Sequence, residues 1–106
     1  MFHRLFPRRK PQAQPLFAIG SLQLSEKVHW LASKGLLDPL PYVQRHMRGD
    51  WGEIDEPHRQ ANAVALDQDS SMISRYRITP HLVLVVMTSE DHKTTVVQLP
   101  EEKSLI

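Results

Sequence analysis

The side chains best suited to chemistry in this chain lie between residues 46 and 58. Two imidazoles and four carboxylates occur there: His46, Asp50, Glu53, Asp55, Glu56 and His58. Oxygen and imidazole ligands at this density are suited to Mg²⁺, Mn²⁺ or Zn²⁺, and paired carboxylates can share acid–base work. One hypothesis is therefore metal-assisted hydrolysis of a nucleic acid or nucleotide by the two histidines with Asp50 and Glu53.

The spacing of these groups favours a structural interpretation over a catalytic one. Metal ligands on a helix need partners three or four residues apart on one face, and no H-E-x-x-H motif occurs. Asp55 and Glu56 directly precede Pro57, which is the composition of a helix N-terminus, where carboxylates cap the helix and face the positive end of its dipole. The chain also lacks a G-x-S-x-G nucleophile setting and a phosphate-binding glycine loop. We therefore predict no catalytic residues, no metal and no cofactor.

Gly49 and Gly52 bracket Asp50 and Trp51, and this grouping predicts a tight, specified turn. The two glycines allow the backbone to fold closely around a fixed ring, so we interpret all three as a structural anchor. Trp51 is expected to bury its indole against the sheet and to donate its N–H to a carbonyl. The alternative is an exposed tryptophan that recognises a partner.

Three polar side chains beside the turn are also given structural roles. Asp50 is predicted to accept backbone amides of its own turn, and Arg48 to pair with Asp50 or with Glu53. His46 follows the apolar side of a short helix near its C-terminal end, where the helix dipole favours a protonated imidazole. A capping histidine is the favoured interpretation, and a general base is the alternative.

Size and composition indicate a small folded protein. At 106 residues, with 41% hydrophobic and 24% charged residues, the chain is predicted to form one domain. The absence of cysteine excludes disulfides, thiolate metal sites and cysteine nucleophiles. No run reaches the roughly 18–20 apolar residues that span a bilayer, and residues 1–10 lack the apolar core of a secretory signal. These features favour a cytoplasmic location.

Residues 1–15 are predicted to form a flexible, basic, proline-rich arm. The chain carries a net charge of only +1, yet four cations lie in this arm: Arg4, Arg8, Arg9 and Lys10. Proline lacks an amide donor, so the arm is not expected to form regular helix. A solubilising tail is the favoured interpretation, and contact with nucleic acid or anionic lipid is the alternative. Residues 16–102 then form a single globular domain, and residues 103–106 a C-terminal tail.

Apolar periodicity and capping residues predict three short helices, at residues 26–34, 39–48 and 55–66. Ser25 caps the first helix, Asp38-Pro39 opens the second, and Gly49 ends it. The inward-facing positions are predicted to be Val28, Leu31, Ala32, Leu40, Val43, Met47, Ile54, Ala61, Val64, Ala65 and Leu66.

Residues 72–78, 82–87 and 94–99 alternate or are continuously apolar, which predicts three strands. Their connections have hairpin length, so an antiparallel meander follows. Residues 16–24 add a fourth, short strand. Helices first and strands after them define an α+β fold, with two or three short helices packed on the sheet. An open edge of such a sheet also allows a homodimer.

Arg75 and Arg77 alternate on one face of a predicted strand, with Tyr76 between them. On an exposed face these guanidinium groups can contact phosphates. Four carboxylates lie nearby in sequence and are expected to neutralise them: Glu90, Asp91, Glu101 and Glu102.

Several motifs occur in a fixed order: R-H-M-R-G-D-W-G at 45–52, A-N at 61–62, Y-R at 76–77 and L-P-E-E at 99–102. In this order they resemble a group of short bacterial proteins carried on plasmids and integrative elements, which share an RHxRGDWG turn and a TT…LPEE segment. The resemblance covers roughly residues 16–102. It departs at residues 26–27, where Pro-Gly is usual, and at residues 92–93, where an arginine is usual. It implies a shared fold and a mobile-element setting, and it supplies no catalytic residues.

We therefore expect a small non-enzymatic interaction protein of a mobile element that contacts another protein and modulates a host defence complex. The candidate surface comprises Arg48, Asp50, Glu53, Asp55, Glu56 and His58. Two alternatives remain: the metal-dependent hydrolase described above, and nucleic-acid binding through the basic arm with Arg75 and Arg77.

Overall fold

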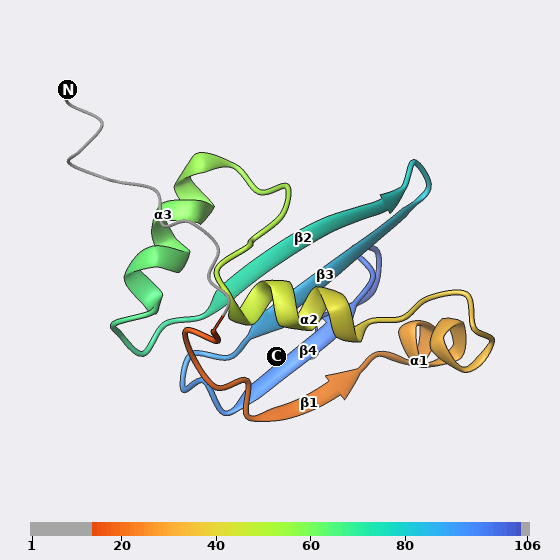
Figure 1. The fold of residues 1–106 in the computed structure, drawn as a ribbon, viewed down its shortest axis with the longest axis horizontal. Helices are drawn as coiled ribbons and strands as arrows, with labels where there is room; N and C mark the ends of the chain where they lie inside the picture. Colours follow the sequence, from red (N-terminus) through yellow and green to blue (C-terminus); the bar gives the residue numbers. More distant parts are fainter. Residues whose placement is uncertain (1–13, 105–106) are drawn as a thin grey trace.

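A computed structural model of the protein describes residues 14–104, which form a four-stranded mixed sheet and three helices (Figure 1). The sheet has the order β1-β4-β3-β2. Its strands are β1 (Ser21–Leu24), β2 (Met72–Thr79), β3 (Leu82–Thr88) and β4 (Thr94–Gln98). The helices are α1 (Glu26–Ser33), α2 (Leu40–Met47) and α3 (Glu56–Ala65). The predicted α+β class is confirmed. No helix in the described range is long and apolar enough to cross a membrane.

Strands β2, β3 and β4 form the predicted antiparallel meander. Only Pro80 and His81 separate β2 from β3, and a loop this short forces the two strands to run in opposite directions. The register pairs Met72 with Thr88 at one end and Arg77 with Val83 towards the other.

The fourth strand is present, but it is shorter than expected and runs parallel to β4, so the sheet is mixed. It occupies Ser21–Leu24 rather than the whole of residues 16–24. Gly20, at φ +68°, precedes it, and a Cβ at this position would lie 2.2 Å from the carbonyl oxygen of Lys93. The chain can approach β4 so closely only where it carries no side chain.

Helices α1 and α3 begin at the capping residues that the sequence indicated, whereas α2 begins after Pro39, which supplies no side-chain cap. The Ser25 hydroxyl accepts a hydrogen bond from the amide of Val28, and a carboxylate oxygen of Asp55 accepts one from the amide of His58. The Asp38 carboxylate accepts one from the amide of Leu40. These bonds satisfy N–H groups that the first turn of a helix leaves without an intrahelical partner.

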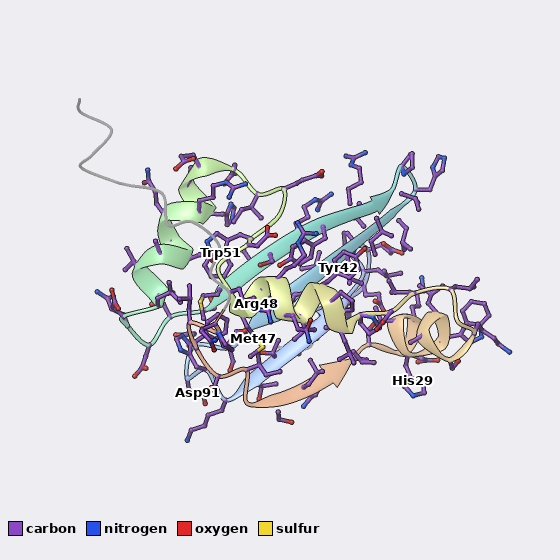
Figure 2. All side chains as sticks on the ribbon, in the orientation of Figure 1. His29, Tyr42, Met47, Arg48, Trp51 and Asp91 are labelled. Carbon is purple, nitrogen blue, oxygen red and sulfur yellow. The ribbon has the colours of Figure 1, made fainter. Side chains whose placement is uncertain are left out.

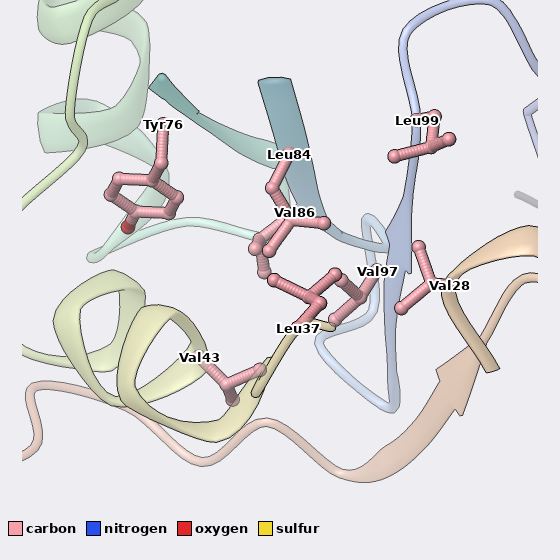
Figure 3. Packing of buried hydrophobic residues seen from close by; sticks show 8 residues of the cluster. All are labelled: Val28, Leu37, Val43, Tyr76, Leu84, Val86, Val97 and Leu99. Carbon is pink, nitrogen blue, oxygen red and sulfur yellow. The ribbon is translucent and has the colours of Figure 1, made fainter. Parts of the chain in front are cut away.

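The larger core lies between α2 and one face of the sheet (Figure 3). It comprises Val28, Leu37, Val43, Tyr76, Leu84, Val86, Val97 and Leu99. A smaller cluster of Trp51, Ala65 and Met72 lies beside α3. Three positions predicted to face inward are wrong. Leu40 is 55% exposed, Val64 is 52% exposed, and Ala61 is also exposed.

The two errors in α3, at Ala61 and Val64, have one physical reason. This helix lies beside β2 (Figure 1), so part of its inner side meets strand backbone as well as the apolar cluster around Ala65. The residue buried there is the polar Asn62, which is 1% exposed. Its amide nitrogen donates to the carbonyl of Ile73 (2.7 Å), and its oxygen accepts from the amide of the same residue (3.0 Å).

The outer border of β2 is closed over two successive outward-facing residues. Asn62 occupies both backbone groups of Ile73. The amide of Arg75 donates to the carbonyl of Trp51 (3.1 Å), and the carbonyl of Arg75 accepts from the amide of Glu53 (2.6 Å). An exposed strand border is a template for unwanted pairing, and these contacts remove it here.

Replacing Asn62 should therefore be costly. Asn62→Ala would leave the amide and the carbonyl of Ile73 without their partners, and we expect it to lower the free energy of unfolding by about 2 kcal/mol. Urea denaturation measures this loss. Gln60→Ala, at an exposed position of the same helix, is the control and should change stability little. Equal stability of the two variants would contradict the bridging role of Asn62.

Candidate functional site

The turn at residues 49–52 joins α2 to the border of β2 and is held from three sides. Gly49 and Gly52 have φ values of +85° and +72°. The Asp50 carboxylate accepts the amide of Gly52 (3.2 Å), which confirms the predicted turn bond. The Tyr76 hydroxyl donates to the carbonyl of Asp50 (2.6 Å), and the amide of Asp50 donates to the carbonyl of Arg45 (2.9 Å).

The cation beside Asp50 is Arg45, so the predicted pairing with Arg48 is wrong. Arg45 Nε lies 2.7 Å from Oδ2 of Asp50, and Arg45 Nη2 lies 3.2 Å from Oδ1. The same guanidinium lies over the ring of Tyr76, 4.6 Å from its centroid. Burial opposes the charge of Asp50, but the hydrogen bonds from Arg45 and Gly52 outweigh it and hold the pKa of Asp50 below its usual value.

Two further arginines reach the same turn. Arg59 Nη2 donates to the carbonyl of Gly52 (2.6 Å), and Arg77 Nε lies 3.5 Å from a carboxylate oxygen of Glu53. Arg75 and Arg77 are both exposed on one face of β2, as expected. Glu53 is the carboxylate that neutralises Arg77.

The four acidic residues expected to neutralise these arginines have other partners. Glu102 accepts from the Ser25 hydroxyl (2.7 Å) and from the amide of Leu99 (2.8 Å). Glu101 lies 3.9 Å from the ammonium group of Lys27. Asp91 accepts from the hydroxyl of Ser89 and the amide of Lys93 in its own loop, and Glu90 is exposed beside it. The neutralising role predicted for these acids is therefore wrong.

The remaining candidate residues lie at the exposed start of α3. Asp55 Oδ1 accepts the amide of His58 (3.0 Å) and lies 2.6 Å from His58 Nδ1. The bonds from the His58 amide and ring lower the pKa of Asp55. Asp55 therefore caps the helix as predicted, and Glu56 follows it in the first turn.

Trp51 is buried, at 4% exposure, as predicted (Figure 2). Its ring meets the imidazole of His46 edge-on, with 5.6 Å between the ring centroids, and it packs with Ala65 and Met72. The expected hydrogen bond from its indole N–H to a carbonyl is not among those formed within residues 14–104. Trp51 is therefore anchored by ring packing and by its own carbonyl, which accepts the amide of Arg75.

His46 is the centre of a buried polar network. It is 0% exposed, and so are three hydroxyl residues around it: Ser74 on β2, Thr88 on β3 and Thr95 on β4. Nδ1 of His46 lies 2.5 Å from Ser74 Oγ, and Nε2 lies 2.9 Å from Thr88 Oγ1. Thr88 Oγ1 is in turn 2.8 Å from Thr95 Oγ1, and Thr95 donates to the carbonyl of Ile19 (2.8 Å).

These contacts determine the direction of every bond in the network. The single proton of the Thr95 hydroxyl goes to the carbonyl of Ile19, so Thr95 can only accept from Thr88. Thr88 therefore accepts from His46, which places the imidazole proton on Nε2. The other ring nitrogen, Nδ1, then accepts from the Ser74 hydroxyl. The network is satisfied with a neutral imidazole in one tautomer.

The protonated capping histidine predicted from the sequence is therefore wrong. Burial lowers the pKa of His46 to about 3, because a charged imidazole would not be solvated by water at this position. The Ser74–His46 contact has the geometry of a nucleophile and a base. A base with so low a pKa is inefficient near neutral pH, and neither side chain is exposed to a substrate. The contact is structural.

The four residues of the metal hypothesis do not meet. His46 is inside the core, Asp50 binds Arg45, Glu53 lies beside Arg77, and His58 lies on Asp55. Within residues 14–104, no three His, Asp or Glu side chains are arranged to hold a metal ion.

A shallow hollow of about 650 Å³ lies beside the start of β2 and the end of β3. Its apolar lining includes Ile73 and Met87, its polar lining includes Ser71 and Asp91, and His58 is the one candidate residue that lines it. The hollow thus brings together only one of the candidate residues.

One exposed apolar group was not predicted from the sequence. Trp30, Leu36 and Leu40 are 54%, 63% and 55% exposed and belong to the segment from α1 to the start of α2. The detectable signal was Trp30 itself, which lies outside the apolar positions of its helix. The basic residues Arg4, Arg8, Arg9 and Lys10 lie outside the described residues.

Comparison of the chain with protein-family models, with curated proteins and with solved structures found no match.

Gly52 should tolerate no side chain. A Cβ at Gly52 would lie 2.1 Å from the carbonyl oxygen of Arg75 and 2.6 Å from the ring of Tyr76, so Gly52→Ala should lower the free energy of unfolding by about 3 kcal/mol or more. Gly35 is a matched control, because it also has φ +72° but a Cβ there would meet no atom within 4 Å. Gly35→Ala should cost about 1 kcal/mol. Urea denaturation of both variants measures the difference, and equal losses would contradict the close approach at Gly52.

The buried His46 should make stability depend on pH. Its pKa is about 3 in the folded protein and near 6.5 in the unfolded chain, so between these values the unfolded chain binds more protons and is favoured as pH falls. The loss should be about 1.4 kcal/mol per pH unit below pH 6.5. Carboxylates with a lowered pKa, such as Asp50 and Glu102, add to this loss of stability only below about pH 4.5.

Urea denaturation at pH 7.5 and pH 5 should therefore show a decrease of about 2 kcal/mol. His46→Gln keeps hydrogen-bonding groups but does not titrate, so this variant should be less stable at pH 7.5 and should lose far less on going to pH 5. The same decrease in both proteins would show that His46 is not its source.

Proposed function

We propose that the protein is a small, non-enzymatic interaction protein that acts by contact with another protein. The observation that carries the proposal is the exposure of three large hydrophobic residues, Trp30, Leu36 and Leu40, within residues 30–40. Three of the four large exposed hydrophobic residues in the described range belong to this one segment, and the fourth, Val64, lies on α3.

Position and chemistry both suit this segment to binding. Helix α1 and the loop after it extend past the end of the strands, so a partner can reach them without meeting the sheet (Figure 1). Tryptophan is enriched among residues that dominate binding energy, because a large ring loses much exposed surface at little cost in conformational entropy. The ammonium group of Lys34 lies 6.0 Å from the Trp30 ring centroid, which adds a polar rim to the apolar centre.

The acidic segment at residues 48–58 is a second candidate binding surface. The side chains of Glu53, Asp55 and His58 are about three-fifths exposed, at 59%, 63% and 59%. Each already has a partner inside the protein, in Arg77 or at the start of α3. A binding protein would have to replace these contacts, whereas a partner of the Trp30 group would replace water and the contact of Lys34 with the Trp30 ring.

The two alternative functions receive less support. Hydrolysis needs reacting groups that converge, and His46, Asp50 and His58 each face a different partner. Nucleic-acid binding through β2 relies on Arg75 and Arg77, of which Arg77 is already beside Glu53.

The resemblance to short proteins of plasmids and integrative elements suggests the setting of this contact. In that setting the partner would be a component of a host defence complex, and the protein would modulate it. This part of the proposal depends on the 45–52 turn and the 99–102 segment that carry the resemblance.

Affinity capture from the native host with variants of the two surfaces tests the proposal. Trp30→Ala combined with Leu36→Ser should reduce recovery of a specific partner at least tenfold, because a truncated hot-spot residue costs about 2 kcal/mol or more of binding energy. Val64→Ser removes an exposed hydrophobic elsewhere and should not reduce recovery.

The double charge reversal Glu53→Lys with Glu56→Lys examines the acidic segment in the same experiment. Loss of the partner in this variant alone would move the contact to residues 48–58. Retention of the partner in every variant would exclude both surfaces, and circular dichroism confirms that each variant is folded.

A further inference from the structure

The two borders of the sheet differ, because one is covered and the other is open. The proposed function involves neither border. The border at β2 is covered at Ile73 by Asn62 and at Arg75 by Trp51 and Glu53. The border at β1 is open, and Figure 1 shows no segment of the described chain beyond it.

The parallel register determines which backbone groups of β1 point outward. The amide of Ser21 donates to the carbonyl of Lys93 (2.8 Å), and the amide of Ser25 donates to the carbonyl of Val97 (2.9 Å). Backbone groups alternate along a strand, so those of Leu22 and Leu24 face away from β4. No backbone group within residues 14–104 pairs with them on the outer side. They offer two donors and two acceptors in an extended arrangement.

We propose that a second copy of this chain pairs with the open border, β1 against β1, antiparallel about a two-fold axis at Gln23. In this register Leu22 lies opposite Leu24 of the second copy, and each amide can donate to the facing carbonyl. The strand sequence Ser-Leu-Gln-Leu carries no charge, so two copies approach without repulsion. The other border is already paired at Ile73 and Arg75, so it is less open to a second copy.

Charges at the ends of β1 favour the same arrangement. With Gln23 at the axis, Gly20 lies opposite Glu26 of the second copy. Gly20 rests against Lys93 on its other side, and it carries no side chain that would separate the two charges. Glu26 and Lys93 are both exposed. The two-fold axis produces this acid–base contact twice.

The contact is small, because four backbone hydrogen bonds and two exposed ion pairs lie well below the area of a permanent interface. The dimer should therefore form reversibly and with rising concentration. The pairing uses the backbone of β1 with Glu26 and Lys93, so it does not depend on the proposed function.

Sedimentation velocity of the full chain from micromolar to millimolar concentration tests the pairing. As concentration increases, the weight-average mass should rise from that of the monomer towards that of the dimer. Glu26→Lys and Lys93→Glu should each weaken the dimer by about fivefold to tenfold, because each replaces two attractions with two repulsions. Combining Glu26→Lys with Lys93→Glu in one chain should restore the dimer. Lys27→Glu, a charge reversal one position along α1 at a residue that faces Glu101, is the matched control and should not change the dimer.

Hydrogen exchange locates the contact independently of any variant. The amides of Leu22 and Leu24 should gain protection as concentration rises, while those of Ser21 and Gln23 should be protected throughout. A monomer at every concentration would overturn the proposal. A dimer without added protection at Leu22 and Leu24 would overturn it too and place the contact elsewhere. Partner recovery and dimer mass are measured separately, so failure of the pairing is distinguishable from failure of the proposed function.

Discussion

The fold depends on a neutral imidazole sealed between α2 and the sheet. His46 connects its helix to β2 through Ser74 and to β3 through Thr88, and the same chain of hydroxyls continues through Thr95 on β4. A buried polar group is costly unless it is satisfied, and every member of this network has a partner. The direction of the bonds admits one tautomer, so the network also fixes where α2 lies on the sheet. Apolar packing alone would allow the helix to slide along the strands.

The turn after α2 extends this constraint to the border of the sheet. Trp51 packs against the edge of the His46 ring, and its carbonyl accepts the amide of Arg75 on β2. Asp50 holds the turn from the other side through Arg45 and Tyr76. The residues whose composition suggested a metal site therefore connect a helix to a strand. Their charges are used within the protein, which explains why a dense group of acids and histidines has no convergent geometry.

The features that could be predicted from sequence are those determined by neighbouring residues. Ser25 and Asp55 cap helices because their side chains reach amides three residues ahead. The meander follows because its loops are too short for a parallel crossover. The burial of Trp51 followed from its glycine neighbours. The errors concern partners distant in sequence. His46 contacts residues 28 and 42 positions away, so its charge state could not be inferred from the end of its own helix. The burial of Asn62 could not be predicted either, because nothing local indicates that α3 meets the backbone of β2.

The positions of the exposed apolar side chains and of the open sheet border follow from the same architecture. Polar residues occupy the interior beneath α2 and beside α3, while Trp30, Leu36 and Leu40 remain outside. Strand β1 leads directly into α1, so the open border and the exposed apolar group are neighbours in sequence (Figure 1). A two-fold axis at Gln23 would place the two α1 helices at opposite ends of the paired sheet. A dimer would then carry the segment of Trp30 twice, once at each end. Binding to a partner with repeated sites would be strengthened by the high effective concentration of the second surface, without any additional contact.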